Sequence, residues 1–300
     1  MKAITNLLKA PFPWFGGKSR VAGPVWSRFG NVQNYVEPFF GSGAVLLARP
    51  TIYGAETVND ADCFLSNFWR ALQQVPDEVA RWADYPVNEA DLHARHRWLV
   101  NRTEFREKMK TNPDYFDAKI AGWWVWGLSM WIGSGWCSFD PVQFRRHQNQ
   151  RMNLSSNNGI LGQLPVMGVH RKRPHLTSRG IGVHRKRPHL TSSGMGIVSV
   201  SYGNLLAYFE ALANRLRYVR VCCGDWTRVL GNTPTTGHKR LTAVFLDPPY
   251  SEEAGRSDNL YSVDDLQVAK EVAKWAVENG NNPLMRIALC GYDGEHTMPS

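Results

Sequence analysis

The sequence lacks several features that would assign it to common classes of protein. No apolar run reaches the length of a transmembrane helix, and the N-terminus lacks the apolar core of a signal peptide. The five cysteines form no CxxC pair and no regular spacing. Neither a zinc site nor a disulfide framework is therefore indicated. We expect a cytoplasmic protein that requires no metal ion and does not bind a membrane.

Acidic residues are missing from one long segment. Between Pro141 and Phe209 there is no Asp or Glu, whereas ten of the 35 Lys and Arg residues lie there. The rest of the chain is close to neutral, so this segment accounts for the formal net charge of +9. The phosphate backbone of a nucleic acid is its natural partner. A solvated loop or a surface for anionic lipid is the alternative.

The basic segment contains a tandem repeat with a period of fourteen residues, GVHRKRPHLTS, starting at Gly168 and again at Gly182. Two copies are too few for a solenoid, so a local duplication in an exposed loop is the plainer interpretation. Its basic blocks are expected to contact phosphates, which gives affinity without sequence readout. The candidate contacts are Arg145, Arg146, Arg171, Lys172, Arg173, Arg185, Lys186 and Arg187.

Apolar runs alternate with amphipathic helical patterns in both flanks of the chain, which indicates an α/β fold with a mainly parallel sheet. We expect strands within 35–40, 51–60, 217–225, 241–247 and 283–290, and helices within 44–48, 61–109, 202–219 and 263–278. The middle interrupts this alternation. We therefore predict one domain from 1–60 and 200–300, and an inserted helical and basic domain over 61–199.

Three predicted strand ends carry acidic groups and glycines suited to a bound ligand, in the stretches EPFFGSG, VND and CGDW. The turn Gly41-Ser42-Gly43 lets backbone approach a ligand closely, and Asp60 is placed to accept hydrogen bonds from ribose hydroxyls. The same arrangement describes a dinucleotide enzyme. However, the third glycine of GxGxxG is absent, and a Glu-Pro pair before the turn is unusual there. A nicotinamide-dependent oxidoreductase is one alternative.

The stretch LTAVFLDPPY, which ends at Tyr250, places a carboxylate, two prolines and a tyrosine after an apolar strand. The exocyclic amine of a nucleobase is a poor nucleophile because its lone pair is delocalised into the ring. The Asp247 carboxylate and the Pro248 carbonyl can each accept one N–H bond and turn that lone pair toward an electrophile. Pro248 and Pro249 stiffen the loop beforehand, and Tyr250 can stack on the base.

The motifs PWFGGK, EPFFGSGAV, ND and DPPY, in that order, resemble those of the Dam-type DNA adenine-N6 methyltransferases of the alpha group. The resemblance covers about 11–75 and 200–296. It implies a class I S-adenosylmethionine-dependent methyltransferase fold, which is Rossmann-like, with an inserted and mostly helical target-recognition domain. It also implies S-adenosylmethionine as methyl donor and double-stranded DNA as partner.

The resemblance assigns roles to single residues. Asp60 would bind the cofactor ribose, and Asp225 with Trp226 would hold its adenine. The cofactor-binding residues would be Trp14, Lys18, Glu37, Pro38, Phe39, Gly41, Gly43, Asp60, Asp225, Trp226 and Asp247. The catalytic loop would be Asp247, Pro248, Pro249 and Tyr250.

The middle of the chain departs from the Dam pattern. GWWVWGLSMWIGSGWC stands where Dam-type enzymes have an Asn- and Gly-containing helix and loop that help bind DNA, so recognition of GATC is not implied. Helical spacing favours core packing for most of the five tryptophans between Trp123 and Trp136. Trp136, in a glycine-rich stretch, is the best candidate for DNA contact. After the fifth expected strand, either the chain is truncated or the sheet closes without the family's usual hairpin.

We expect the protein to methylate the N6 amine of an adenine that is flipped out of the DNA duplex. The long basic segment favours relaxed sequence specificity. A phage or prophage origin, or a restriction-modification role, in a bacterial or phage-infected cell would suit the family. The alternatives are methylation of RNA or of the cytosine-N4 amine, and a catalytically inactive DNA-binding protein.

Overall fold

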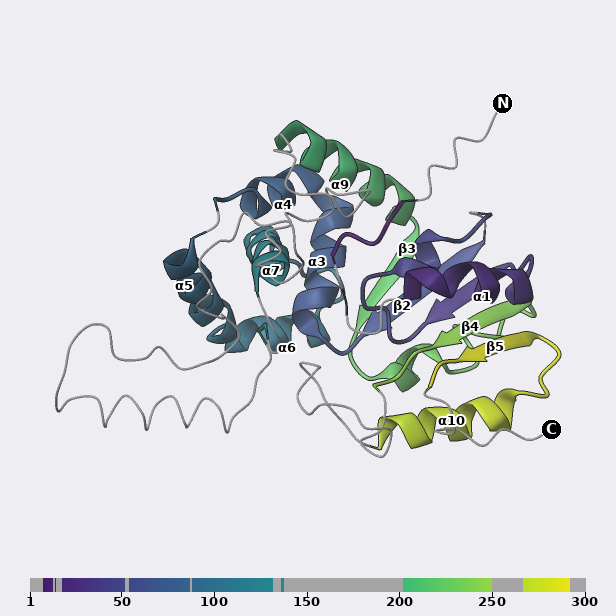
Figure 1. Ribbon diagram of the computed structural model, residues 1–300. Coiled ribbons are helices and arrows are strands. Elements are labelled where there is room, and N and C mark those ends of the chain that lie inside the picture. Colours follow the sequence, from purple (N-terminus) through teal and green to yellow (C-terminus); the bar gives the residue numbers. More distant parts are fainter. Residues whose placement is uncertain are drawn as a thin grey trace, which may run out of the picture.

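The computed structural model describes residues 8–12, 14, 18–51, 54–86, 88–131, 136–137, 202–249 and 267–291. At the centre of this part lies a five-stranded sheet in the order β3-β2-β1-β4-β5, with every neighbouring pair parallel (Figure 1). The strands are β1 Asn34–Glu37, β2 Ala55–Asp60, β3 Val219–Cys223, β4 Thr242–Leu246 and β5 Met285–Leu289. Four of them lie inside the predicted strand segments and β1 begins one residue before its segment, so the prediction of an α/β fold with a parallel sheet is confirmed.

The described helices fall into a layer on the sheet and a group beside it. Their bounds are η1 Lys18–Arg20, α1 Ala22–Phe29, α2 Ala44–Leu47, α3 Cys63–Gln74, α4 Pro76–Ala83, α5 Glu89–Val100, α6 Thr103–Thr111, α7 Ala118–Met130, α9 Tyr202–Leu216, η3 Trp226–Val229 and α10 Val268–Asn279. In Figure 1, α4 to α7 gather on one side of the molecule, and α3 and α9 lie between them and the sheet. α10 covers the opposite face.

The three central strands β1, β2 and β4 are buried on both faces, which explains why β4 reads as an apolar run rather than as an alternating pattern. On one face, Val244 and Leu246 pack in a cluster with Trp226 of η3 and Val272 of α10. On the other face, Phe245 joins the larger core formed with α1, α2 and α3. Successive residues of β4 therefore alternate between two separate apolar layers.

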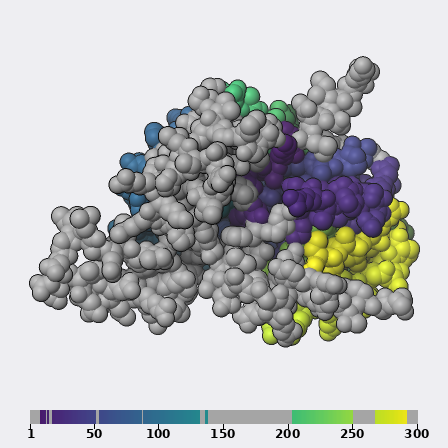
Figure 2. Space-filling view, viewed as in Figure 1, coloured from purple at the N-terminus to yellow at the C-terminus, as the bar shows by residue number. Residues whose placement is uncertain are grey.

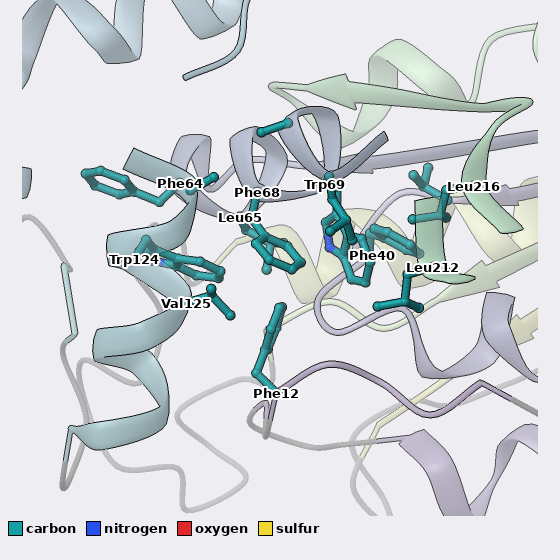
Figure 3. Packing of buried hydrophobic residues seen from close by; sticks show 14 of the residues in the cluster. Phe12, Phe40, Phe64, Leu65, Phe68, Trp69, Trp124, Val125, Leu212 and Leu216 are labelled. Carbon is teal, nitrogen blue, oxygen red and sulfur yellow. The ribbon is translucent and has the colours of Figure 1, made fainter. Parts of the chain in front are cut away.

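Helix α3 joins the sheet to the helical group. Its N-terminus is capped by Asp62, whose carboxylate accepts the N–H groups of Phe64 at 2.8 Å and Leu65 at 3.3 Å. The helix contacts β2 and β3 on one side and α7 and α9 on the other. Figure 3 shows aromatic residues of α3 facing Trp124 of α7 and side chains of α9. α3 opens the predicted insert 61–199, yet it packs directly on the sheet, and that domain division stays a prediction.

The N-terminal helix lies beside the C-terminal strand of the sheet. Figure 2 shows the purple N-terminal segment and the yellow C-terminal elements next to one another on the same face. The guanidinium of Arg286 in β5 donates a hydrogen bond to the carbonyl oxygen of Phe29, the last residue of α1. This hydrogen bond holds α1, which follows η1, against β5, the neighbour of β4 in the sheet.

A buried ion triad ties α9 to the N-terminal end of β2. Glu56 accepts hydrogen bonds from Arg49 at 2.9 Å and from Arg215 at 2.7 and 2.8 Å. The three side chains are 2 to 6% exposed. Because two buried guanidinium groups depend on one carboxylate, the loss of its charge would leave both without compensation.

The variant Glu56→Gln should lower the free energy of unfolding by about 3 kcal/mol or more, because it keeps the shape of the side chain and removes the charge. Denaturant unfolding followed by circular dichroism measures the change. Glu104→Gln is the matched control, since its ion pair with Lys108 is long, at 3.9 Å, and exposed. It should cost less than about 0.5 kcal/mol. Equal losses in the two variants would contradict a structural role for the triad.

Candidate active site

Three acidic residues lie where neighbouring strands end. Glu37 is the last residue of β1, Asp60 is the last residue of β2, and Asp247 directly follows β4. From β1 the chain continues outward through β2 to β3, and then crosses back to β4 on the other side of β1. The switch point therefore falls between β1 and β4. Ligands of open α/β sheets bind beyond the carboxyl ends of the strands at this point.

The glycine turn after β1 is held against the end of β2. The N–H of Phe40 donates to the Asn59 carbonyl at 3.0 Å, and the N–H of Gly41 donates to Asp60 Oδ2 at 3.0 Å. Gly41 and Gly43 have φ of +49° and +71°, a region that L side chains rarely adopt. Trp69 of α3 donates its indole N–H to the Gly41 carbonyl at 3.1 Å. The turn is thus fixed from both sides.

Residues of the N-terminal motif PWFGGK contact both the glycine turn and the DPP sequence. A Cβ atom added to Gly41 would lie 2.7 Å from Cδ1 of Trp14, so the indole rests against this glycine. Lys18 Nζ lies 2.8 Å from Asp247 Oδ1. Residues that are far apart in the sequence, and that were predicted to bind cofactor or to act in catalysis, are therefore neighbours.

Burial and neighbouring charges raise the pKa of two acidic groups at this edge. Burial, together with the charges of Asp247 and Asp60, raises the pKa of Glu37 well above its usual value, although the Tyr35 hydroxyl donates to it at 2.8 Å. Burial and the charge of Asp62 raise the pKa of Asp60 to about 7 against the opposing effect of its backbone N–H bonds. A positively charged ligand would relieve this accumulation of negative charge.

The loop after β3 lies at the same edge of the sheet as the carboxyl ends of the other strands. Asp225 is exposed and caps η3 by accepting the N–H of Thr227 at 2.9 Å. The buried ring of Trp226 lies 6.2 Å from the ring of Phe39, centroid to centroid, so the β1 and β3 loops meet. Glu37, Pro38, Phe39, Gly41, Gly43, Asp60, Asp225, Trp226 and Asp247 are all placed along this edge.

Asn59 is a structural residue of the site that we did not predict. Its side chain is 1% exposed, and its amide donates to the Pro38 carbonyl at 3.1 Å and to the Gly224 carbonyl at 2.9 Å. It therefore ties the loops after β1 and β3 to β2. The sequence signal that could have identified Asn59 was its position in the ND motif, where only Asp60 was given a role.

Trp136 is buried rather than presented to a partner. The residue is 7% exposed, and its indole N–H donates to the Trp124 carbonyl at 2.9 Å. Its ring packs near those of Trp131 and His96. The polar edge of the indole is thus already used inside the protein, and the expected DNA contact stays a prediction.

Two groups of predicted site residues cannot be placed. Tyr250 of the predicted catalytic loop lies outside the described residues. So do the predicted phosphate contacts Arg145, Arg146, Arg171, Lys172, Arg173, Arg185, Lys186 and Arg187.

Residues 14–123 match the family model of the D12 class N6 adenine-specific DNA methyltransferases. This segment is therefore similar to that family. The family methylates the N6 amine of adenine in DNA, with S-adenosylmethionine as methyl donor. A search of curated proteins finds no similar sequence.

The matched segment begins at Trp14 and includes Lys18, the glycine turn and Asp60. The DPP sequence at the end of β4 lies beyond it, and the sheet brings the two parts together. Among the described residues, no helix is long and apolar enough to cross a bilayer. The same residues contain no cluster of three His, Cys, Asp or Glu side chains able to hold a metal ion.

The pKa of Asp60 predicts a pH dependence of stability. Folded Asp60 keeps its proton up to about pH 7, whereas an aspartate in the unfolded chain loses it near pH 4. The folded state therefore binds more protons in this window, and stability falls as pH rises from about 4 to about 7. Asp60→Asn should remove this decrease, which amounts to at most about 1.4 kcal/mol per pH unit.

Denaturant unfolding at several pH values measures the decrease. The readout is the slope against pH, because the asparagine also loses one N–H acceptor and lowers stability at every pH. Asp114→Asn, at an exposed position, is the control and should keep the wild-type slope. An unchanged wild-type slope in Asp60→Asn would contradict the pKa of about 7, whereas a smaller remaining slope is expected because the pKa of Glu37 is also raised.

Proposed function

We propose that the chain binds S-adenosylmethionine along the carboxyl edge of β1, β2 and β3, and presents a flipped-out adenine of double-stranded DNA to Asp247, Pro248, Pro249 and Tyr250. The observation that carries the proposal is the 2.8 Å ion pair between Lys18 and Asp247. It joins the N-terminal motif to the DPP sequence at the switch point of the sheet. Groups that can accept hydrogen bonds from an amine therefore lie next to residues suited to bind a cofactor.

The residues of this edge fit the chemistry of the cofactor. S-adenosylmethionine carries a positive sulfonium and an ammonium group, and it supplies a methyl group activated by that sulfonium. Glu37, Asp60 and Asp247 lie in surroundings of low exposure, and a cationic ligand favours the ionised form of the first two, whose pKa values are raised. Gly41 has no side chain at a position where a Cβ would meet Trp14. The Trp14 indole can therefore pack directly on this backbone.

Each cofactor-binding residue has a proposed role. Asp60 accepts hydrogen bonds from the ribose hydroxyls, in addition to those that it accepts from Gly41 and Asp62. Asp225 and Trp226 hold the adenine end of the cofactor. The methionine end lies near Trp14, Lys18, Glu37, Pro38, Phe39, Gly41 and Gly43.

The DPP sequence prepares the target amine rather than deprotonating it. The Asp247 carboxylate and the Pro248 carbonyl each accept one N–H bond of the adenine amine. This favours a tetrahedral nitrogen whose lone pair faces the methyl donor. After the N–C bond forms, the amine releases a proton to solvent, so no strong base is required. The proline ring fixes φ and reduces the movement of both acceptors.

The basic residues between Arg145 and Arg187 are proposed to contact DNA phosphates. Phosphate contacts orient a protein on DNA and carry no sequence information directly. Affinity should therefore fall steeply as salt increases, with relaxed sequence specificity. This part of the proposal depends on charge alone.

Asp247→Ala should lower the rate of methyl transfer about 100-fold or more, because one of the two proposed acceptors of the amine is lost. Labelled methyl incorporation into DNA, followed by digestion to nucleosides, measures the rate and identifies the product. Affinity for S-adenosylmethionine should change much less. Wild-type product on cytosine or RNA, or full activity in Asp247→Ala, would overturn the assignment.

Gly41→Ala should weaken binding of S-adenosylmethionine at least tenfold. The new methyl group would meet the Trp14 ring at 2.7 Å and would strain a residue with φ of +49°. Gly23→Ala is the matched control. Gly23 lies in α1, and no atom lies within 4 Å of its added Cβ. Calorimetric titration compares the two variants, and equal affinities would place the cofactor elsewhere.

A further inference from the structure

The ion pair between Lys18 and Asp247 is largely shielded from water. The side chains are 13% and 19% exposed, and Nζ lies 2.8 Å from Oδ1. Lys18 belongs to η1, which precedes the sheet, whereas Asp247 follows β4. An ion pair with this little exposure is screened less by solvent and salt than a surface pair.

Asp247 is surrounded by groups that disfavour its negative charge. Glu37, at the end of β1, is 3% exposed, and Asp60 ends β2. Cys290 follows β5, and burial together with the charge of Asp247 raises the pKa of its thiol to about 12. Lys18 has the opposite effect on Cys290, which places its ammonium group within electrostatic range of this thiol as well as of Asp247.

The protonation state of Asp247 decides whether it can act on an amine. An ionised carboxylate only accepts hydrogen bonds, whereas a protonated one presents an O–H donor on one oxygen. Beside Glu37 and Asp60, a carboxylate without a cation would tend to keep its proton. It would then offer a donor where the adenine amine needs an acceptor.

We propose that Lys18 is a positioning residue of methyl transfer, whose ammonium keeps Asp247 ionised and fixed as the acceptor of the adenine amine. The inference rests on the proposed function, and it deepens the role of Lys18 beyond cofactor binding. It also explains why Asp247 is an acceptor rather than the base. A carboxylate stabilised by a lysine is a weaker base, so the proton of the amine passes to solvent.

The two roles of Lys18 can be separated by single-turnover kinetics at saturating S-adenosylmethionine. The acid limb of the pH–rate profile is the fall in rate at low pH. Lys18→Met should move the midpoint of this limb upward by about one to three pH units. Lys18→Arg should keep the limb near the wild-type position, because a guanidinium can pair with the carboxylate. The proposal is overturned if the acid limb of Lys18→Met stays at the wild-type pH and the variant only needs a higher concentration of S-adenosylmethionine for saturation.

A second measurement needs neither DNA nor cofactor. Carbon-13 NMR of protein labelled at the aspartate carboxyl carbons follows Asp247, whose signal is assigned by its loss in Asp247→Asn. Its titration midpoint should rise by about one to three pH units in Lys18→Met. Lys108→Met, which removes an exposed ion pair, is the control and should leave it unchanged. An unchanged midpoint in a folded Lys18→Met or Lys18→Gln protein would contradict the proposal.

The two experiments distinguish failure of the inference from failure of the function. If wild-type protein transfers no methyl group to DNA, the proposed function fails, and the NMR titration still decides whether Lys18 controls Asp247. If methyl transfer occurs and the midpoint does not move, the proposed function stands and the role of Lys18 is wrong.

Discussion

The close approach of three carboxylates at one edge of a parallel sheet is the constraint on which the rest of the site depends. The strand order places the ends of β2, β1 and β4 side by side, and with them Asp60, Glu37 and Asp247. In surroundings of low exposure, such charges are costly unless they are protonated, paired or offset by a ligand. The raised pKa of Glu37, the ion pair of Asp247 with Lys18 and the proposed affinity for a cationic cofactor all follow from this arrangement.

The strands could be predicted from sequence because a parallel sheet covered on both faces requires continuous apolar residues. Thr242–Leu246 is fully buried, and its side chains enter two different clusters. The motifs marked the strand ends for the same reason, since glycine and aspartate stop an apolar run. The strand order could not be read in this way. It depends on which crossovers pack together across the whole chain.

Contacts between distant residues account for what the sequence did not reveal. The Lys18–Asp247 pair joins two motifs that were assigned separate tasks. Asn59 donates to carbonyls of two other loops, which no local pattern indicates. Trp136 lies in a glycine-rich stretch that resembles an exposed loop, yet its N–H group finds a carbonyl of α7. A local sequence shows that an indole needs a partner, but not where that partner lies.

The most direct test is calorimetric titration of the protein at pH 7 with S-adenosylmethionine and with its product S-adenosylhomocysteine, in buffers of different ionisation enthalpy. If the acidic edge receives the sulfonium, binding of S-adenosylmethionine should release more protons than binding of the product, which lacks that charge. Equal proton release for the two ligands, or binding of neither, would contradict the account.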